Sequence, residues 1–419
     1  MKFDEYSISE GIKKSIAKQG FKKPTDIQYK SIPPILRGED VLAIAQTGTG
    51  KTAAFVIPIL HLLQVKKTVR KSAGIKCLVM APTHELALQI NEVFVSLSKH
   101  TKVNSFCIHG GVEQDRQKEE LGKGVDVLIA TPGRLFDLVS QGDVVLKGLE
   151  ILVLDEADHM LDLGFIKDIK DLMRHLPERR QTLFFSATIN EKIKKLAYSL
   201  VVNPIRIQIS PKDPVAKNIE HAVASIEMDD KRFFLGNMLA EHPDRKTLVF
   251  VRTKVRAERL KLALERQKIE AITIHGDKDQ KERESSMQAF RKGEQKTLIA
   301  TDISARGIDI PNVEFVVNYD LPESAEQYVH RVGRTGRGRE KGQALSFCAT
   351  EEVALLEEID QNLGKPIARL EISKKNYQMT KASVTENNNE EDWKSLMEHA
   401  AIETEAWEKK KKKRKKNKK

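Results

Sequence analysis

Short aliphatic runs alternate along this chain with longer segments of helical pattern, and this alternation constrains the fold more than any other feature. Such a rhythm is typical of βαβ units, in which helices connect parallel strands and cover the sheet. The runs are rich in Val, Ile, Leu and Phe, as strands buried on both faces are. In the first half of the chain they lie at 41–44, 77–81, 105–108, 125–130, 151–154 and 182–187.

The rhythm stops at a polar connector with two prolines, ISPKDPVAKN, and then restarts. The second set of runs lies at 247–251, 271–274, 297–300, 315–319 and 344–348. We therefore expect two tandem α/β domains, each a mostly parallel sheet flanked by helices. Their expected bounds are 1–208 and 219–372, with a linker at 209–218 and a polar, lysine-rich tail at 373–419 that is largely disordered.

The basic character of the chain belongs to its last residues. The 71 Lys and Arg exceed the 60 Asp and Glu by 11, but the last eleven residues hold ten of the basic residues and no acid, so the remainder carries only +1. Any nucleic-acid affinity of the body must therefore come from locally placed groups. The lysine run itself fits either a sequence-independent RNA tether or a solvated terminus.

Several classes of protein are excluded. No apolar run approaches the 18 or so residues of a membrane-spanning helix, and the start MKFDEYSISE has no apolar signal segment. The three cysteines are far apart and form no CxxC or Cys/His spacing, which argues against a disulfide framework or a zinc site. We expect a cytoplasmic protein without membrane partners.

The segment AQTGTGKT follows the first aliphatic run and precedes a helical one. This is the context of a phosphate-binding loop, because glycines let backbone N–H groups approach phosphate oxygens at a helix N-terminus. Lys51 would reach the β- and γ-phosphates, and the Thr52 hydroxyl would bind Mg²⁺. Ala45 stands where the general pattern has Gly, and an ordinary strand-to-helix turn is the alternative. The loop residues are Thr47, Gly48, Thr49, Gly50, Lys51 and Thr52.

The run at 151–154 ends in DEAD, so its carboxylates lie at the sheet edge where α/β proteins bind ligands. Asp155 can hold Mg²⁺, and Glu156 can orient and deprotonate an attacking water. An acidic helix cap is the alternative. Upstream, Gln28 can pair with adenine N6 and N7 and Phe21 offers a stacking face, although a core Phe beside a Pro-Thr turn fits the same residues.

These elements, together with other segments in the same order, closely resemble the DEAD-box RNA helicases, with some likeness to the bacterial RhlE-type members. The resemblance runs from about Phe3 to about Arg369. The other segments are APTHELA, the Gly110–Gly111 pair, TPGR, SAT, TLVFVRT, HGDKDQKER, TDISARGID and HRVGRTGR.

The resemblance implies two RecA-like domains that close on ATP, Mg²⁺ and single-stranded RNA. Phe21 and Gln28 would recognise adenine, and Asp309 would contact the ribose. Arg334 and Arg337 would act as arginine fingers, which stabilise the charge of the transition state. Ser186 and Thr188, with Asp158, would couple the ATP state to the RNA state, whereas the sequence without the resemblance fits a simple helix cap at the two hydroxyls.

The RNA contacts that the resemblance implies come from glycines, small hydroxyls and scattered arginines, which bind phosphates and sugars and carry no base-edge code. Binding should therefore be independent of base sequence. His84 stands where the family usually has Arg, so one phosphate contact is weaker or pH-dependent unless His84 only packs at its helix start. The implied contacts are His84, Gly110, Gly111, Thr131, Arg134, Arg252, Thr253, Arg283, Thr301 and Arg306.

We expect an ATP-dependent RNA helicase whose ATP hydrolysis is stimulated by RNA. It would bind single strands and short duplexes, and would locally unwind the duplexes or remodel RNA–protein complexes. Ribosomal or RNA-decay complexes are possible settings. One rival hypothesis is a non-hydrolysing RNA clamp, against which the intact Lys51, Glu156, Arg334 and Arg337 argue. The other is a DNA translocase, against which the DEAD and GFKKPTDIQ segments argue.

Overall fold

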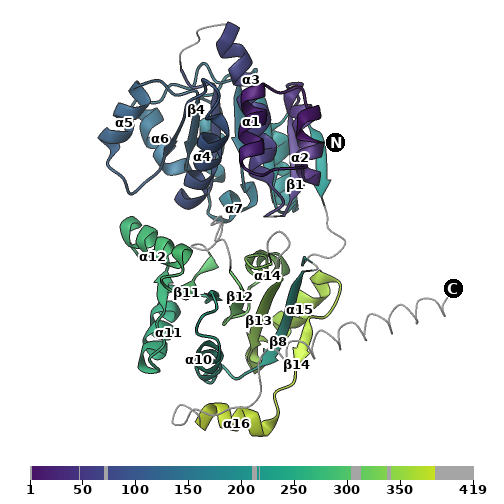
Figure 1. Cartoon of the computed structure of the whole chain (residues 1–419), viewed down its shortest axis with the longest axis vertical. Coiled ribbons are helices and arrows are strands. Elements are labelled where there is room, and N and C mark those ends of the chain that lie inside the picture. The colour runs from purple at the N-terminus through teal and green to yellow at the C-terminus, as the bar shows by residue number, and fades with distance from the viewer. Residues whose placement is uncertain are drawn as a thin grey trace, which may run out of the picture. The chain divides into compact units, whose positions relative to one another are not determined.

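The computed structural model describes residues 2–46, 48–69, 74–209, 215–216, 218–302, 313–336 and 341–382. These residues form two compact units, the first carrying strands β1 to β7 and the second carrying β8 to β14 (Figure 1). The expected fold class, tandem α/β domains on parallel sheets, is confirmed. The lysine run and most of the expected tail lie outside the described residues, as do Thr47, Arg306, Asp309 and Arg337.

The first unit is a parallel seven-stranded sheet in the order β3-β4-β2-β5-β6-β1-β7. Its strands are β1 (Val41–Ala45), β2 (Cys77–Met80), β3 (Ser105–Ile108), β4 (Val127–Ala130), β5 (Ile151–Leu154), β6 (Gln181–Ser186) and β7 (Ile205–Ile209). Its helices are η1 (Phe3–Glu5), α1 (Glu10–Lys18), α2 (Asp26–Leu36), α3 (Lys51–Val69), α4 (His84–Ser98), α5 (Gln114–Gly122), α6 (Pro132–Ser140), α7 (Ala157–Asp162), α8 (Ile166–Met173) and α9 (Glu191–Leu200).

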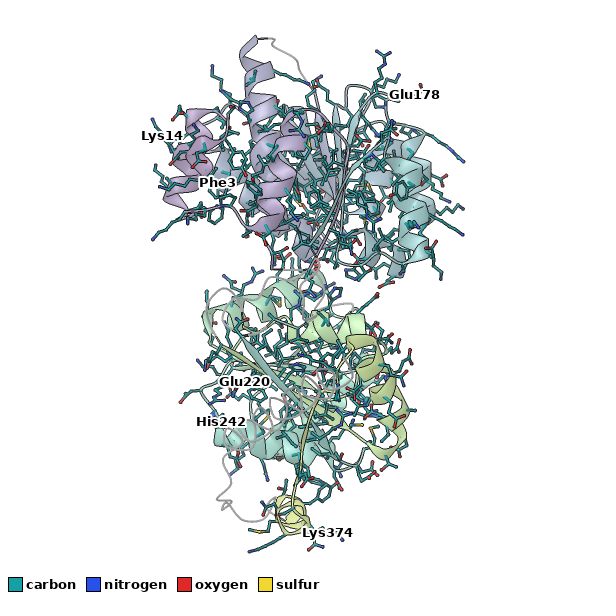
Figure 2. The ribbon with its side chains drawn as sticks, turned by 90° about the vertical axis from the view of Figure 1, so that its right-hand side faces the viewer. Phe3, Lys14, Glu178, Glu220, His242 and Lys374 are labelled. Atoms are coloured by element: carbon teal, nitrogen blue, oxygen red, sulfur yellow. The ribbon has the colours of Figure 1, made fainter. Side chains whose placement is uncertain are left out.

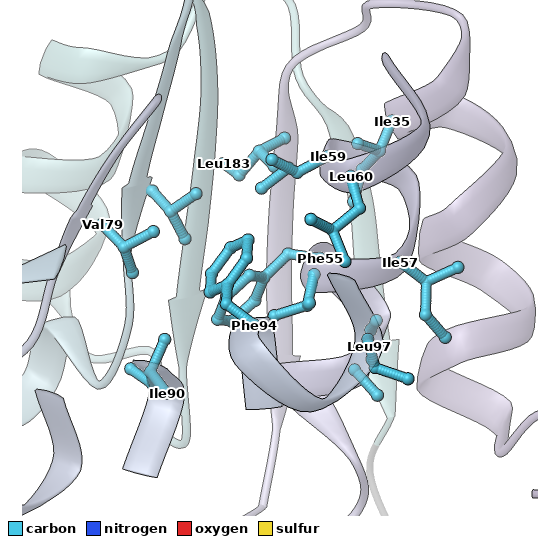
Figure 3. Packing of buried hydrophobic residues seen from close by; sticks show 14 of the residues in the cluster. Ile35, Phe55, Ile57, Ile59, Leu60, Val79, Ile90, Phe94, Leu97 and Leu183 are labelled. Carbon is cyan, nitrogen blue, oxygen red and sulfur yellow. The ribbon is translucent and has the colours of Figure 1, made fainter. Parts of the chain in front are cut away.

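Both faces of this sheet are buried. Along β1, Val41 and Ala43 face the cluster built with α1 to α4, whereas Leu42 and Ile44 face the cluster built with α6 to α9. This alternation follows from the two-residue period of a strand. Figure 3 shows part of the first cluster, in which the buried rings of Phe55 and Phe94 lie 6.5 Å apart between their centroids. Burial of each such ring contributes about 1.5–3 kcal/mol.

The second unit is a parallel seven-stranded sheet in the order β10-β11-β9-β12-β13-β8-β14. Its strands are β8 (Ile219–Ser225), β9 (Thr247–Phe250), β10 (Ile272–Ile274), β11 (Thr297–Ala300), β12 (Phe315–Asn318), β13 (Gly342–Cys348) and β14 (Ala368–Leu370). Its helices are α10 (Lys231–Glu241), α11 (Lys254–Arg266), α12 (Gln280–Lys292), α14 (Ala325–Val332), η2 (Thr350–Glu352), α15 (Val353–Leu363) and α16 (Lys374–Ala382). Charged side chains such as Lys14 of α1 lie on the outside of the first unit (Figure 2).

The two sheets have the same topology. When β8 is matched with β1, β9 with β2 and so on to β14 with β7, the order of the second sheet repeats that of the first strand for strand. The local structure repeats as well. Thr83 caps α4 by accepting a hydrogen bond from the Leu86 N–H, and Thr253 caps α11 by accepting one from the Arg256 N–H. The carboxyl ends of β2 and β9 therefore present the same hydroxyl-capped helix start.

Three strands and one helix differ from the sequence-based expectation. The edge strands β7 and β14, and β8 beside the latter, were not among the expected strands, because β7 is largely exposed and β14 is only three residues long. The helix α16 continues the second unit beyond residue 372. It packs against α10 (Figure 1). There the Tyr377 hydroxyl donates to Asp230 Oδ2 (2.9 Å) and accepts from the Glu227 N–H (3.1 Å).

Candidate active site and nucleic-acid interface

The phosphate-binding loop connects β1 to α3. Gly48 and Gly50 adopt left-handed backbone conformations, with φ of 79° and 91°, which favour glycine. A Cβ at Gly50 would also lie only 2.6 Å from Gln28 Nε2. The Thr49 hydroxyl donates to the Gln46 carbonyl (2.7 Å) and closes the turn. Lys51 begins α3, and its buried Nζ makes no hydrogen bond to the described residues.

Gln28 packs against this loop. Its Nε2 donates to the Gly50 carbonyl (3.2 Å), and its Oε1 accepts from the Thr25 N–H (3.0 Å) in the capping box of α2. An amide group has two donors and two acceptor sites, so one of each remains for an adenine. The ring of Phe21 is 41% exposed and lies 6.4 Å from the ring of Phe3. It is therefore accessible for stacking and is not a core residue.

The DEAD segment follows β5 at the carboxyl edge of the same sheet. Asp155 is buried, and its Oδ1 accepts a hydrogen bond from the Glu156 N–H (3.0 Å). Burial raises the pKa of Asp155 to about 7, and the nearby Lys51 charge opposes that rise. Glu156 precedes α7 in a left-handed conformation (φ 49°, ψ 51°), which is uncommon for a residue with a side chain and is often found at functional sites. The carboxylates and Lys51 thus share one buried, charged region.

Asp158 connects the DEAD segment to the end of β6. Its Oδ2 accepts hydrogen bonds from the Ala187 N–H (3.0 Å), the Thr188 N–H (2.9 Å) and the Thr188 hydroxyl (3.2 Å). The structure therefore brings Asp158 and Thr188 into direct contact. Ser186 does not join them, because its hydroxyl is buried and has no hydrogen-bond partner within the described ranges.

The sequence-predicted RNA residues of the first unit gather at the carboxyl ends of β2, β3 and β4, which are neighbours in the sheet. The His84 ring lies 5.2 Å from the His109 ring, and a Cβ at Gly110 would be 3.2 Å from the His84 ring. Arg134 Nη2 donates to the Val112 carbonyl (3.2 Å), which ties α6 to the loop after β3. Gly111 has a left-handed φ of 76°, and Thr131 precedes α6 as its N-cap residue.

In the second unit the predicted residues are more scattered. Arg252 and Thr253 follow β9 and Thr301 follows β11, whereas Arg283 lies within α12. Arg334 is buried, and its Nε donates to the His330 carbonyl (3.2 Å) of α14.

A buried charge network beside Arg252 was missed by the sequence reasoning. Lys231 is fully buried and donates to Glu352 Oε2 (2.5 Å), and Arg252 Nη2 lies 3.4 Å from Glu352 Oε1. Asp320 Oδ2 accepts from the Arg252 N–H (2.9 Å) and pairs with Arg256 Nε (3.2 Å). Nothing in the residue pattern distinguished these groups from ordinary surface charges, because each lies just past a strand or at a helix start.

Within the described ranges, no helix combines the length and the apolar character that a membrane-spanning segment needs. Among the same residues, no three or more His, Cys, Asp or Glu side chains form a group that could hold a metal. The oxygen donors Asp155 and Thr52 nevertheless suit Mg²⁺, which takes one or two protein ligands together with substrate phosphates.

Comparison with known proteins agrees with this geometry. Residues 25–196 match the family model described as DEAD/DEAH box helicase, and residues 230–339 match the helicase conserved C-terminal domain. The chain is 39% identical to the DEAD-box ATP-dependent RNA helicase RhpA of Helicobacter pylori over 370 residues, covering 88% of this chain and 74% of RhpA. It is also 39% identical to the ATP-dependent RNA helicase CshA of Listeria monocytogenes, with 88% and 70% covered.

A solved structure of S. cerevisiae Dbp5 bound to RNA and ADP BeF3 is similar to this fold. Its TM-score is 0.80 at 31% identity, and the match covers 92% of this chain and 100% of Dbp5. The likeness to RhlE-type members stays a prediction. The matched domains and the identity to curated helicases together establish that this chain belongs to the DEAD-box family of ATP-dependent RNA helicases.

Proposed function

We propose that the chain couples Mg²⁺-dependent ATP hydrolysis to sequence-independent RNA binding and to the local separation of short duplexes. The observation that carries this proposal is the common sheet edge of the first unit, where Lys51, Asp155 and Glu156 lie beside the Asp158–Thr188 contact. Lys51, Asp155 and Glu156 suit the binding and hydrolysis of a phosphate group. The Asp158–Thr188 contact suits the transmission of a conformational change to the loop after β6.

Each part of the first unit has a chemical role in this proposal. Backbone N–H groups of the loop that holds Gly48 and Gly50, with Lys51, bind the phosphates. Thr52 and Asp155 hold Mg²⁺, which neutralises charge on the phosphate oxygens. Glu156 orients the attacking water and takes its proton.

Further residues, among them Phe21 before α2 and Gln28 within it, complete the proposed roles. Arg334 and Arg337 supply positive charge to the transition state, and Asp309 contacts the ribose. Phe21 and Gln28 select adenine. Asp158, Ser186 and Thr188 link hydrolysis to RNA binding. The setting is cytoplasmic, and ribosomal or RNA-decay complexes are the proposed partners.

The test is the rate of ATP hydrolysis by the full chain without polymer, with single-stranded RNA and with single-stranded DNA of the same sequence. We expect RNA, but not DNA, to stimulate ATP hydrolysis, because contacts to 2′-hydroxyls distinguish the two polymers. Equal rates with and without RNA would contradict the proposal. Equal stimulation by DNA would favour the translocase alternative.

We predict that His84→Arg tightens binding of single-stranded RNA, because a permanently charged guanidinium replaces a ring that is largely neutral near pH 7. One added phosphate contact should steepen the dependence of log K on log salt by about 0.7. Fluorescence anisotropy over a salt series, at pH 6 and pH 8, measures both the affinity and the slope. An unchanged slope at both pH values would mean that His84 only packs against His109.

A further inference from the structure

His159 is a buried histidine whose polar atoms are not accounted for by the fold. It lies on α7, three residues after Glu156, and is only 4% exposed. Neither of its ring nitrogens makes a hydrogen bond within the part of the chain that the structure describes. Leaving a buried polar group without such a partner costs about 1–3 kcal/mol. A histidine at this position is therefore unfavourable if its only role is to pack.

The acceptor next to this ring is the proposed catalytic carboxylate. His159 Nδ1 lies 3.6 Å from Glu156 Oε2. Glu156 precedes α7 in its left-handed conformation, and the first helical turn then carries the two side chains to the same place. The separation exceeds the usual 2.7–3.2 Å of a hydrogen bond. Catalytic hydrogen bonds are often long before substrate binds, and this one has to shorten by only about 0.4 Å to reach that range.

The backbone of His159 belongs to the contact that joins α7 to the end of β6. Its N–H donates to Asp158 Oδ1 (3.1 Å), while Asp158 Oδ2 accepts from Ala187 and Thr188. A continuous series of contacts therefore runs from the segment after β6, through Asp158 and His159, to Glu156. Any shift of that segment that moves Asp158 also moves the His159 backbone.

We propose that His159 is a positioning residue for Glu156, which it orients through an Nδ1–H hydrogen bond, and that it relays the position of the 187–188 segment to the attacking water. A carboxylate only accepts, so the ring carries its proton on Nδ1 when the pair closes. That proton stays on His159, and the proton released by water goes to Glu156. The inference rests on the proposed role of Glu156 as the general base.

Two substitutions separate positioning from packing. His159→Phe keeps a ring of similar volume but has no donor, whereas His159→Asn is smaller but keeps an N–H close to the position of Nδ1. We expect His159→Phe to lower kcat for RNA-stimulated ATP hydrolysis by about 10- to 100-fold, the usual cost of losing an orienting hydrogen bond. The KM for ATP and the Kd for RNA should change by less than about twofold, and His159→Asn should retain kcat within about threefold.

A purely structural role predicts the opposite order, because the smaller Asn leaves a cavity and Phe does not. Wild-type kcat in His159→Phe, or an equal loss in both variants, would overturn the proposal. If thermal unfolding shows that His159→Phe does not fold, His159→Leu takes its place as the variant without a donor.

The variants Glu156→Gln and His159→Phe together separate the role of His159 from the proposed function. If Glu156→Gln hydrolyses ATP normally, the proposed function is wrong, whatever His159 does. If Glu156→Gln is inactive and His159→Phe is fully active, only the role of His159 is wrong. In the Glu156→Gln background, His159→Phe should cause no further loss, because residues that act as a unit are not additive.

Discussion

Glu156→Gln is expected to lower the RNA-stimulated rate of ATP hydrolysis by about 10²- to 10⁴-fold, the usual contribution of a positioned general base. The amide keeps the size of the side chain and its left-handed backbone position before α7, but it cannot take a proton from water. Steady-state phosphate release, measured at saturating ATP and RNA, gives the change in kcat directly. A kcat within threefold of wild type would remove Glu156 from catalysis.

Binding should survive this substitution. The proposed RNA residues of the first unit gather after β2, β3 and β4, whereas Glu156 follows β5. We therefore expect the variant to bind RNA in the presence of ATP at least as well as the wild type, because release follows hydrolysis in the proposed cycle. Asp162→Asn is the matched control, since it removes a carboxylate from an exposed position on the same helix and should leave kcat unchanged.

The strands that the sequence predicts well are those with two buried faces. The runs at 151–154 and 297–300 coincide with β5 and β11, because every one of their residues is buried in the sheet interior and is therefore apolar or small. The edge strand β7 was missed, since exposed Arg206 and Gln208 interrupt its apolar pattern. A strand that is buried on both faces leaves an apolar pattern in the sequence and is therefore easier to predict than an exposed strand at the edge of a sheet.

In the candidate site, too, the sequence predicts some features and not others. Glycine spacing at Gly48 and Gly50 indicates left-handed backbone, and the structure has it. Side-chain pairings leave no such pattern in the sequence. The contact of Glu156 with His159 depends on a left-handed residue before α7, and the contact of Lys231 with Glu352 joins residues 121 positions apart. Only the three-dimensional arrangement shows that these groups are buried together.

The buried pair Lys231–Glu352 carries the second large prediction. Glu352 Oε2 accepts from Lys231, which also donates to the carbonyls of Tyr319 (2.9 Å) and Phe347 (3.1 Å). The two carbonyls lie at the carboxyl ends of β12 and β13, and Lys231 reaches them from the start of α10. We expect Glu352→Gln to destabilise the second unit by about 3–5 kcal/mol, because it leaves a fully buried ammonium group without its counter-charge.

Urea denaturation followed by circular dichroism measures the loss, and hydrogen exchange at the β12 and β13 amides assigns it to the second unit. Glu351→Gln, at the exposed neighbouring position in η2, is the matched control and should change stability by less than about 0.5 kcal/mol. A loss of similar size in both variants would mean that the charge of η2, and not the buried pair, is responsible.

The double variant Lys231→Met/Glu352→Gln distinguishes an unpaired charge from a lost contact. Removing both charges should recover at least half of the stability that Glu352→Gln loses, because a buried ion pair is often no more stabilising than neutral groups of similar volume. Recovery remains incomplete because Glu352 also accepts from the Ala349 N–H (3.1 Å), and one amide oxygen cannot replace two carboxylate oxygens. If the double variant is less stable than Glu352→Gln, the pair itself stabilises the unit, and the cost does not come from isolating Lys231.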